Sequence, residues 1–228
     1  MPQTPDLSGT VALVTGASRG LGRALALALG AAGAEVIALA RTSGALEELD
    51  DAIRAAGGPR ATLTPLDVAE DEGLANLGLA IHQRWGRIDL LVHAAAHAGP
   101  LSPAEHVDAK VWDRCFAVNA RAVSRLIVAA EPLLRPAPRP RAVFFEDRWN
   151  RGAFHGAYAA SKAAGQTAWE AWAAESARKP LEVVGLAPPP MATALRARFH
   201  PGEDRAKLTA ADDTAATLLP QVLGERVA

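Results

Sequence analysis

The chain has 228 residues and a formal net charge of -1, which suits one domain spanning residues 1–228 and offers no basic surface for nucleic acid. No apolar run approaches the about 18 residues that a membrane span requires, and residues 1–10 lack the features of a signal peptide, so we expect a cytoplasmic protein that does not engage a membrane. The one cysteine, Cys115, excludes an internal disulfide, fits a reducing compartment and has no neighbouring ligands that would predict a metal site.

A glycine-rich turn follows the first apolar run of the chain. Val11–Val14 predicts a strand, residues 15–22 read T-G-A-S-R-G-L-G, and an apolar helical stretch comes next. Glycines at such a turn let the backbone approach a pyrophosphate, whose charge is met by amide groups at the start of the helix. The turn therefore favours dinucleotide binding through Gly16, Gly20 and Gly22, spaced TGxxxGxG.

The second predicted strand, Glu35–Ala40, ends at a basic residue, Arg41. An acidic residue at this position would bind the adenosine ribose diol, and none is present. Arg41 and Arg19 could instead hold a 2′-phosphate, for which a guanidinium is well shaped, although both could also be solvated. The interpretation favours NADP(H) over NAD(H).

The next strands complete a repeating strand–helix pattern. Ala61–Leu66 and Ile88–His93 are predicted strands, separated by a helix that ends near Trp85. This spacing implies parallel crossovers and a sheet covered by helices on both faces. Asp67, just past a strand end, could accept from an adenine amino group or could be the N-cap of the following helix.

The second half of the chain continues this alternation. Helix is predicted over Pro103–Leu134, with Asn119 among apolar residues, where it could hold a water, bind a backbone carbonyl or be only structural. Strands are predicted at Ala142–Phe145 and Glu182–Leu186, and an amphipathic helix at about Ala210–Leu223.

A tyrosine and a lysine share one face of the alanine-rich helix that begins near residue 157. Tyr158 and Lys162 are four residues apart in the sequence Y-A-A-S-K. A free phenol titrates at about pH 10, so it is a poor acid at neutral pH unless a positive charge stabilises its anion. Lys162 could supply that charge, and the pair then forms a proton-transfer device. A buried helix tyrosine beside a solvated lysine is the alternative reading.

Taken together, these residues resemble the short-chain dehydrogenase/reductase family, in the same order and over nearly the whole chain. The matching features are the TGxxxGxG turn, Asp67-Val68, Asn119, the YxxxK pair, and Thr193 after Pro188. Residues 187–213 and the G-A-Y-A-A-S-K run are most similar to the YciK-like branch of bacterial members. The resemblance implies an α/β fold with a Rossmann-like doubly wound parallel sheet.

The resemblance also implies a role for each matching residue. Tyr158 would be the general acid or base at the substrate oxygen. Lys162 would bind the nicotinamide ribose and lower the tyrosine pKa, and Asn119 would position a water between Lys162 and solvent. The implied cofactor contacts are Gly16, Ser18, Arg19, Gly20, Leu21, Gly22, Arg41, Asp67, Val68, Ala94, Lys162 and Thr193.

The family's catalytic serine has no counterpart here, so the active site is degenerate. Neither Ser nor Thr occurs between Ser124 and Ser161, and Phe145, Glu146 or Asp147 takes the serine's place. Loss of one such hydrogen-bonding group costs about 2.7–4 kcal/mol in the transition state. A carboxylate beside the phenol would raise the tyrosine pKa unless the carboxylate is protonated or turned away onto an arginine.

Three further features depart from the family pattern. The N-N-A-G segment is here residues 93–96, His-Ala-Ala-Ala, so the asparagine that braces the sheet is absent. Pro188-Pro189 replaces Pro-Gly and removes a backbone N–H. The sequence given ends directly after the last predicted helix, so we expect six strands without the family's usual seventh, and some substrate and subunit contacts to be missing.

We therefore expect an NADP(H)-dependent oxidoreductase that transfers hydride between nicotinamide and a small carbonyl or alcohol substrate. The alternative is a catalytically impaired or non-catalytic dinucleotide-binding or scaffold protein that retains the fold. The resemblance also implies a homodimer or homotetramer, and small residues on the helix after Tyr158 would permit the close helix contact that this needs, although such residues also occur where a helix packs closely on its own sheet. Candidate residues for a partly aromatic substrate pocket, or for ordinary packing under loops, are His97, Trp149, Phe154, His155, Met191 and Phe199.

Overall fold

A parallel sheet forms the centre of the molecule. The structure is a computed structural model that describes residues 5–148 and 150–225. Within these residues the sheet has six strands in the order β3-β2-β1-β4-β5-β6, and every neighbouring pair is parallel. The strands are β1 (Val11–Thr15), β2 (Glu35–Ala40), β3 (Thr62–Pro65), β4 (Leu90–His93), β5 (Arg141–Phe145) and β6 (Glu182–Leu186).

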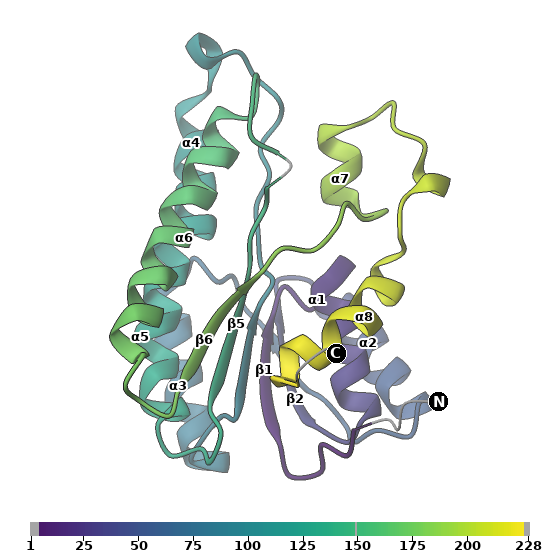
Figure 1. Ribbon diagram of the computed structural model, residues 1–228, viewed down its shortest axis with the longest axis vertical. Helices are drawn as coiled ribbons and strands as arrows, with labels where there is room; N and C mark the ends of the chain where they lie inside the picture. Colours follow the sequence, from purple (N-terminus) through teal and green to yellow (C-terminus); the bar gives the residue numbers. More distant parts are fainter. Residues whose placement is uncertain (1–4, 149, 226–228) are drawn as a thin grey trace.

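Helices cover both faces of this sheet (Figure 1). One face packs against α1 (Gly20–Ala31), α2 (Ser43–Ala55) and α8 (Ala211–Leu223), which share one apolar cluster with the strands. The other face packs against α3 (Asp71–Trp85), α5 (Ala122–Leu134) and α6 (Gly156–Ser176), which share a second cluster. This is the doubly wound, Rossmann-like arrangement that the strand–helix alternation predicts, and the predicted fold class is confirmed.

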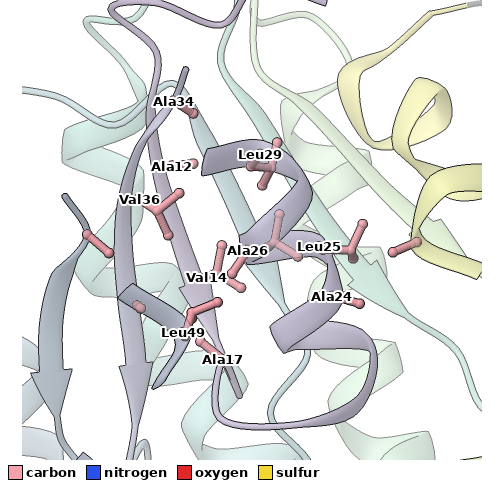
Figure 2. Close-up of a cluster of buried hydrophobic side chains, with 14 of the residues drawn as sticks. Ala12, Val14, Ala17, Ala24, Leu25, Ala26, Leu29, Ala34, Val36 and Leu49 are labelled. Carbon is pink, nitrogen blue, oxygen red and sulfur yellow. The ribbon is translucent and has the colours of Figure 1, made fainter. Parts of the chain in front are cut away.

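The strands are short apolar runs because both of their faces are covered. All residues of β1 and β4 are buried, as expected for strands of a parallel sheet. Figure 2 shows α1 beside β1 and β2, and buried side chains of the helix such as Ala26 and Leu29 belong to the same apolar cluster as Val14 and Val36. This packing fixes the start of α1 directly above the end of β1, where the glycine turn connects them.

The helical region between β4 and β5 is less regular than the sequence predicts. It consists of a 3-10 turn at Ala104–His106, helix α4 (Ala109–Phe116), a π-helical turn at Ala117–Arg121, and α5. Such π-helical turns inside helices occur mostly at functional positions. Here the turn carries Asn119, whose side chain is bonded to the β4–α4 connection rather than to solvent.

Between β6 and α8 the chain makes an excursion away from the sheet, which Figure 1 shows above α8. It carries the short helix α7 (Ala194–Phe199) and a 3-10 turn at Arg205–Lys207. A parallel bridge between Met191 and Thr209 joins the two ends of the excursion. Over the residues that the structure describes, no helix is long and apolar enough to cross a membrane.

Candidate active site

A groove of about 240 Å³ runs along the carboxyl ends of the strands. Its lining includes a residue that follows each strand of the sheet, such as Gly16 after β1, Arg41 after β2 and Ala94 after β4. Parallel strands end at the same edge, and ligands of doubly wound sheets bind there. The groove brings together every predicted cofactor-binding residue: Gly16, Ser18, Arg19, Gly20, Leu21, Gly22, Arg41, Asp67, Val68, Ala94, Lys162 and Thr193.

The glycine turn between β1 and α1 has no room for side chains. A Cβ on Gly22 would lie 2.4 Å from the carbonyl oxygen of Gly16, and a Cβ on Gly16 would lie 2.7 Å from the backbone nitrogen of Ala95. Gly16 and Gly20 also have positive φ angles of 71° and 56°, which favour glycine. The turn is therefore a cradle of backbone at the start of a helix, and its shape fits the diphosphate of a dinucleotide.

Two exposed arginines border the end of the groove near β2. Arg19 and Arg41 both line it, and among the described residues neither guanidinium makes a hydrogen bond or an ion pair. The β2 strand ends at Ala40 without an acidic residue. The two arginines are thus available to a ligand that carries negative charge at this point.

Asp67 lies at the same end of the groove and is held in place by two partners. It accepts a hydrogen bond from the backbone N–H of Ala69 and pairs with the guanidinium of Arg114. Burial alone would raise the pKa of Asp67, but these two bonds lower it below its ordinary value. The alternative that Asp67 is the N-cap of α3 is wrong, because Glu70 occupies that position.

The hydroxyl of Tyr158 donates a hydrogen bond to Asp147 Oδ2 at 2.7 Å. Of the three residues expected at the serine's position, Asp147 is thus the one that contacts the tyrosine hydroxyl, whereas Glu146 is turned onto Arg148. Burial raises the pKa of Tyr158 well above its ordinary value, and the charge of Asp147 raises it further. A carboxylate neighbour is expected to raise a tyrosine pKa in this way. The family resemblance implies the opposite, namely that Lys162 lowers the pKa of Tyr158.

Lys162 points back toward the end of β5. Its Nζ donates to the carbonyl oxygen of Phe145 at 2.9 Å, one turn of α6 beyond Tyr158. Burial lowers the pKa of Lys162, while the charge of Asp147 acts in the opposite direction. The ammonium thus lies close to the carboxylate that holds the tyrosine hydroxyl.

Asn119 lies behind Lys162 rather than in the groove. Its side-chain amide donates to the carbonyl oxygen of His97 and to Ser161 Oγ, and its Oδ1 accepts from the backbone N–H of His97. A second, small cavity of about 10 Å³ is lined by Asn119, Lys162 and Gln166, among others. A space of this size is about the minimum that holds one water molecule.

His93 occupies the position of the family's bracing asparagine. Its Nδ1 is 2.8 Å from Thr15 Oγ1 on the neighbouring strand β1, so the sheet is braced here by a histidine and a threonine. Burial lowers the pKa of His93 from 6.5 to about 3, and the charge of Lys162 contributes to this shift. The imidazole is therefore neutral at physiological pH.

Helix α7 covers the tyrosine from the side of the excursion. The rings of Phe199 and Tyr158 have centroids 4.8 Å apart, and Phe199 also packs against His155. Of the predicted substrate-pocket residues, His97 and Met191 line the main groove. Phe154, His155 and Phe199 line a neighbouring cavity of about 70 Å³ that also touches Tyr158, and Trp149 lies outside the described residues.

Sequence reasoning missed two features of this site. Asn150 binds Asp147 through its backbone N–H and its side-chain amide, and His200 Nε2 donates to Asn150 Oδ1 at 3.0 Å. The only signal for the first contact is the three-residue spacing of an aspartate and an asparagine in an irregular segment, which is typical of turns.

The doubly wound sheet and the groove along its strand ends define a Rossmann-like α/β protein. The sequence profile of the short chain dehydrogenase family matches residues 10–204, and the chain therefore belongs to that family of oxidoreductases.

Several relatives support this assignment. The uncharacterized oxidoreductase YciK of Escherichia coli K12 is 32% identical over 226 residues, which cover 97% of this chain and 88% of YciK. A YciK structure superposes with a TM-score of 0.90, at 31% identity over 97% of this chain and 92% of that one. A short chain dehydrogenase of Escherichia coli CFT073, solved in complex with NADPH, has a TM-score of 0.90 at 32% identity over 97% of this chain and 93% of that one. A short chain dehydrogenase of Pseudocercospora fijiensis is 32% identical over 93% of this chain, which spans 65% of that relative.

Proposed function

We propose that this protein is an NADP(H)-dependent oxidoreductase, a single dinucleotide-binding domain that acts on a small carbonyl or alcohol substrate. The observation that carries the proposal is the position of Tyr158. This residue lines the same groove as the glycine turn, Arg41 and Lys162, although the turn and Arg41 lie more than 100 residues before it in the chain. A proton-transfer group beside a dinucleotide cradle is what hydride chemistry at a carbonyl carbon requires.

The residues present fit a dinucleotide with a 2′-phosphate. The backbone cradle at Gly16 and Gly22 would receive the diphosphate, and Arg19 and Arg41 would hold the 2′-phosphate. The NADPH complex of the relative from Escherichia coli CFT073 supports the same choice of cofactor. When bound, the nicotinamide would donate or accept the hydride.

Three side chains would take part in proton transfer or support it. Tyr158 would give a proton to the substrate oxygen or take one from it, and Lys162 would hold the nicotinamide ribose. Asn119 would help to retain a water beside Lys162, which agrees with the small cavity that both residues line.

A second function is favoured by one specific observation, the hydrogen bond from Tyr158 to Asp147. A phenol that is buried and faces a carboxylate is a weaker acid than an ordinary tyrosine. The protein would then be a non-catalytic dinucleotide-binding or scaffold protein of the same fold.

The proposed setting is a cytoplasmic homodimer or homotetramer that binds neither nucleic acid nor membrane. The exposed face of α6 supports the oligomer, because it presents the small side chains Ala163, Ala164, Thr167 and Ala171 to solvent. These residues lie on the side of the helix opposite Trp169 and Trp172, which are buried against the sheet.

Turnover by the wild type and by Tyr158→Phe separates the two functions. We expect the wild type to reduce members of a panel of small carbonyl compounds with NADPH, or to oxidise the matching alcohols with NADP⁺. Removal of the hydroxyl should lower kcat by about 10²- to 10⁴-fold, the usual contribution of a positioned acid or base, while NADPH binding is retained. Equal rates for the two proteins would contradict the role of Tyr158, and binding without turnover in the wild type would favour the scaffold function.

A further inference from the structure

The hydroxyl of Tyr158, the proposed acid, is hydrogen-bonded directly to the side chain of Asp147. The donor–acceptor distance of 2.7 Å is that of an ordinary O–H···O hydrogen bond and is at the long end of the range for a hydroxyl that donates to an ionised carboxylate. Its direction matters, because the phenol proton points at a carboxylate rather than at an alcohol such as serine. The carboxylate is therefore placed to receive that proton.

Asp147 is held rigidly in this position by its own loop and by α7. The backbone N–H of Asn150 donates to Oδ1 at 3.1 Å, and the side-chain amide of Asn150 donates to Oδ2 at 2.7 Å. Asn150 is buried and accepts in turn from His200 Nε2, at the end of α7. The oxygen that accepts from Tyr158 is thus fixed by a second donor and by a helix that covers the site.

The charges that face Asp147 are mostly cationic. The loop supplies Arg151, which donates to the Asp147 carbonyl oxygen, and Glu146, whose charge is taken up by Arg148. Helix α7 supplies Arg196. Its pKa is raised mainly by the hydrogen bond to Glu203, and the charge of Asp147 raises it further. Among the described residues, the titratable and charged groups around Asp147 come from α6, α7 and its own loop, and include Tyr158, Lys162, Arg196, His200, Glu146, Arg148 and Arg151. Neighbouring cations favour the ionised form of a carboxylate.

We propose that Asp147 is a further catalytic residue, the base that takes the proton of Tyr158 when an alcohol substrate is oxidised. This inference rests on the proposed function. The substrate hydroxyl gives its proton to Tyr158 Oη as the O–H bond of Tyr158 breaks and its proton moves to Asp147 Oδ2. The electron pair of the substrate C–H bond leaves as the hydride that NADP⁺ accepts, so the alcohol is oxidised and NADP⁺ is reduced. The proton held by Asp147 then passes to solvent.

This arrangement assigns the two directions of the reaction to different pH ranges. Oxidation needs ionised Asp147, so its rate rises with pH until the carboxylate is fully ionised. Reduction runs through the same atoms in reverse and needs protonated Asp147, so its rate falls over that same range. Neither direction requires Tyr158 to be ionised beforehand. The carboxylate of Asp147, which disfavours a tyrosinate, is therefore no obstacle to the reaction.

The first test uses the fact that Tyr158 is the only tyrosine of the chain. The ultraviolet absorbance of tyrosinate therefore reports this residue alone, and the titration needs neither cofactor nor substrate. We expect Asp147→Asn and Asp147→Ser each to bring tyrosinate formation about 1 to 3 pH units below its wild-type position, over the range in which circular dichroism indicates a folded protein. Asp212→Asn, an equal change of charge at an exposed position on α8, should leave it unchanged. Identical titrations for wild type and the Asp147 variants would overturn the proposal.

The second test is the pH dependence of kcat/KM for an alcohol that the wild type oxidises. In the wild type, kcat/KM should fall as the pH drops below a midpoint in the range of a carboxyl group. A midpoint in the range of a phenol would overturn the proposal. This result needs the wild type only, so it holds even if both Asp147 variants fail to fold. Asp147→Ser should move the midpoint upward to that of the tyrosine. Binding of NADP(H) is measured in parallel. If the protein does not bind NADP(H), the proposed function is refuted, but the tyrosinate titration still tests the Asp147–Tyr158 contact independently.

Discussion

At the scale of single residues, the carboxyl end of the sheet is braced by a buried neutral imidazole. His93 joins β4 to β1 through Thr15, and its pKa lies at about 3 against an ordinary value of 6.5. Because the folded state disfavours the protonated form, the contribution of this residue to stability is fully present above pH 6.5. It is lost progressively as the pH falls from 6.5 toward 3, since the unfolded chain then binds a proton that the folded chain cannot.

His93→Asn is expected to flatten the acid side of the stability profile. Asparagine keeps a polar group at the brace but does not titrate, so the free energy of unfolding should fall less steeply below pH 6.5, by up to about 1.4 kcal/mol per pH unit. Urea unfolding at a series of pH values measures this slope. His82→Asn, at an exposed position on α3, is the matched control and should leave the slope as in the wild type. Parallel curves for wild type and His93→Asn would contradict the account of His93.

The sequence alone could assign most groove residues. It could not predict the contact between Asp147 and Tyr158 or the contact between His93 and Thr15. Gly16, Arg41 and Ala94 each follow a predicted strand, and parallel strands bring such positions to one edge. The choice among Phe145, Glu146 and Asp147 could not be made, because the segment after β5 is not a regular element and its direction depends on bonds made by Asn150. The His93–Thr15 bond depends on the register between strands whose residues are 78 positions apart.

At the scale of elements, the contact between α6 and the π-helical turn at Ala117–Arg121 holds the proposed catalytic residues together. Gly165 of α6 lies so close to this turn that a Cβ on it would be 2.0 Å from the carbonyl oxygen of Asn119. The small residue therefore lets α6, with Tyr158 and Lys162, approach Asn119. Helical periodicity predicts helix on both sides of this contact, but it cannot predict the π-helical turn, because that turn adds one residue without changing which residue types are apolar.

Gly165→Ala should destabilise the protein despite the higher helix propensity of alanine. The added Cβ would collide with the backbone carbonyl of Asn119, which cannot move aside as a flexible side chain can. We therefore expect a loss of about 1–3 kcal/mol in the free energy of unfolding. Gly156→Ala is the matched control on the same helix, because a Cβ there meets nothing within 4 Å. It should be neutral or stabilising by up to about 1 kcal/mol. Chemical denaturation measures both, and equal stabilities for the two variants would contradict the close contact.

At the scale of the whole molecule, the exposed face of α6 is the surface on which the proposed oligomer depends. Ala164 is exposed in the middle of this face, and a long charged side chain there would keep a second copy of the helix from approaching. Ala164→Arg is therefore expected to shift the protein toward the monomer in analytical ultracentrifugation. Ala55→Arg makes the same change at an exposed position on α2 and should leave the mass as in the wild type. A wild type that is monomeric at all concentrations would remove the proposal.

The fold as a whole follows from patterns that the sequence carries openly. Six apolar runs alternate with helices, and the glycine turn identifies the first crossover, so the doubly wound sheet and the edge that bears the groove are both predictable. The position of α7 over Tyr158 is not, because its packing depends on Phe199 and His200 meeting residues that lie more than one element earlier in the chain.

The measurement that tests the account most directly is thermal unfolding of the wild type titrated with NADPH and with NADH. A ligand that binds only the folded state stabilises it by about 2.7 kcal/mol at a concentration of 100 times Kd. We predict a rise in Tm with NADPH at concentrations where NADH has little effect, and a loss of this difference in Arg41→Ala, which removes one of the two exposed guanidinium groups that line the groove. An unchanged Tm with both nucleotides would contradict the claim that the groove is a dinucleotide site.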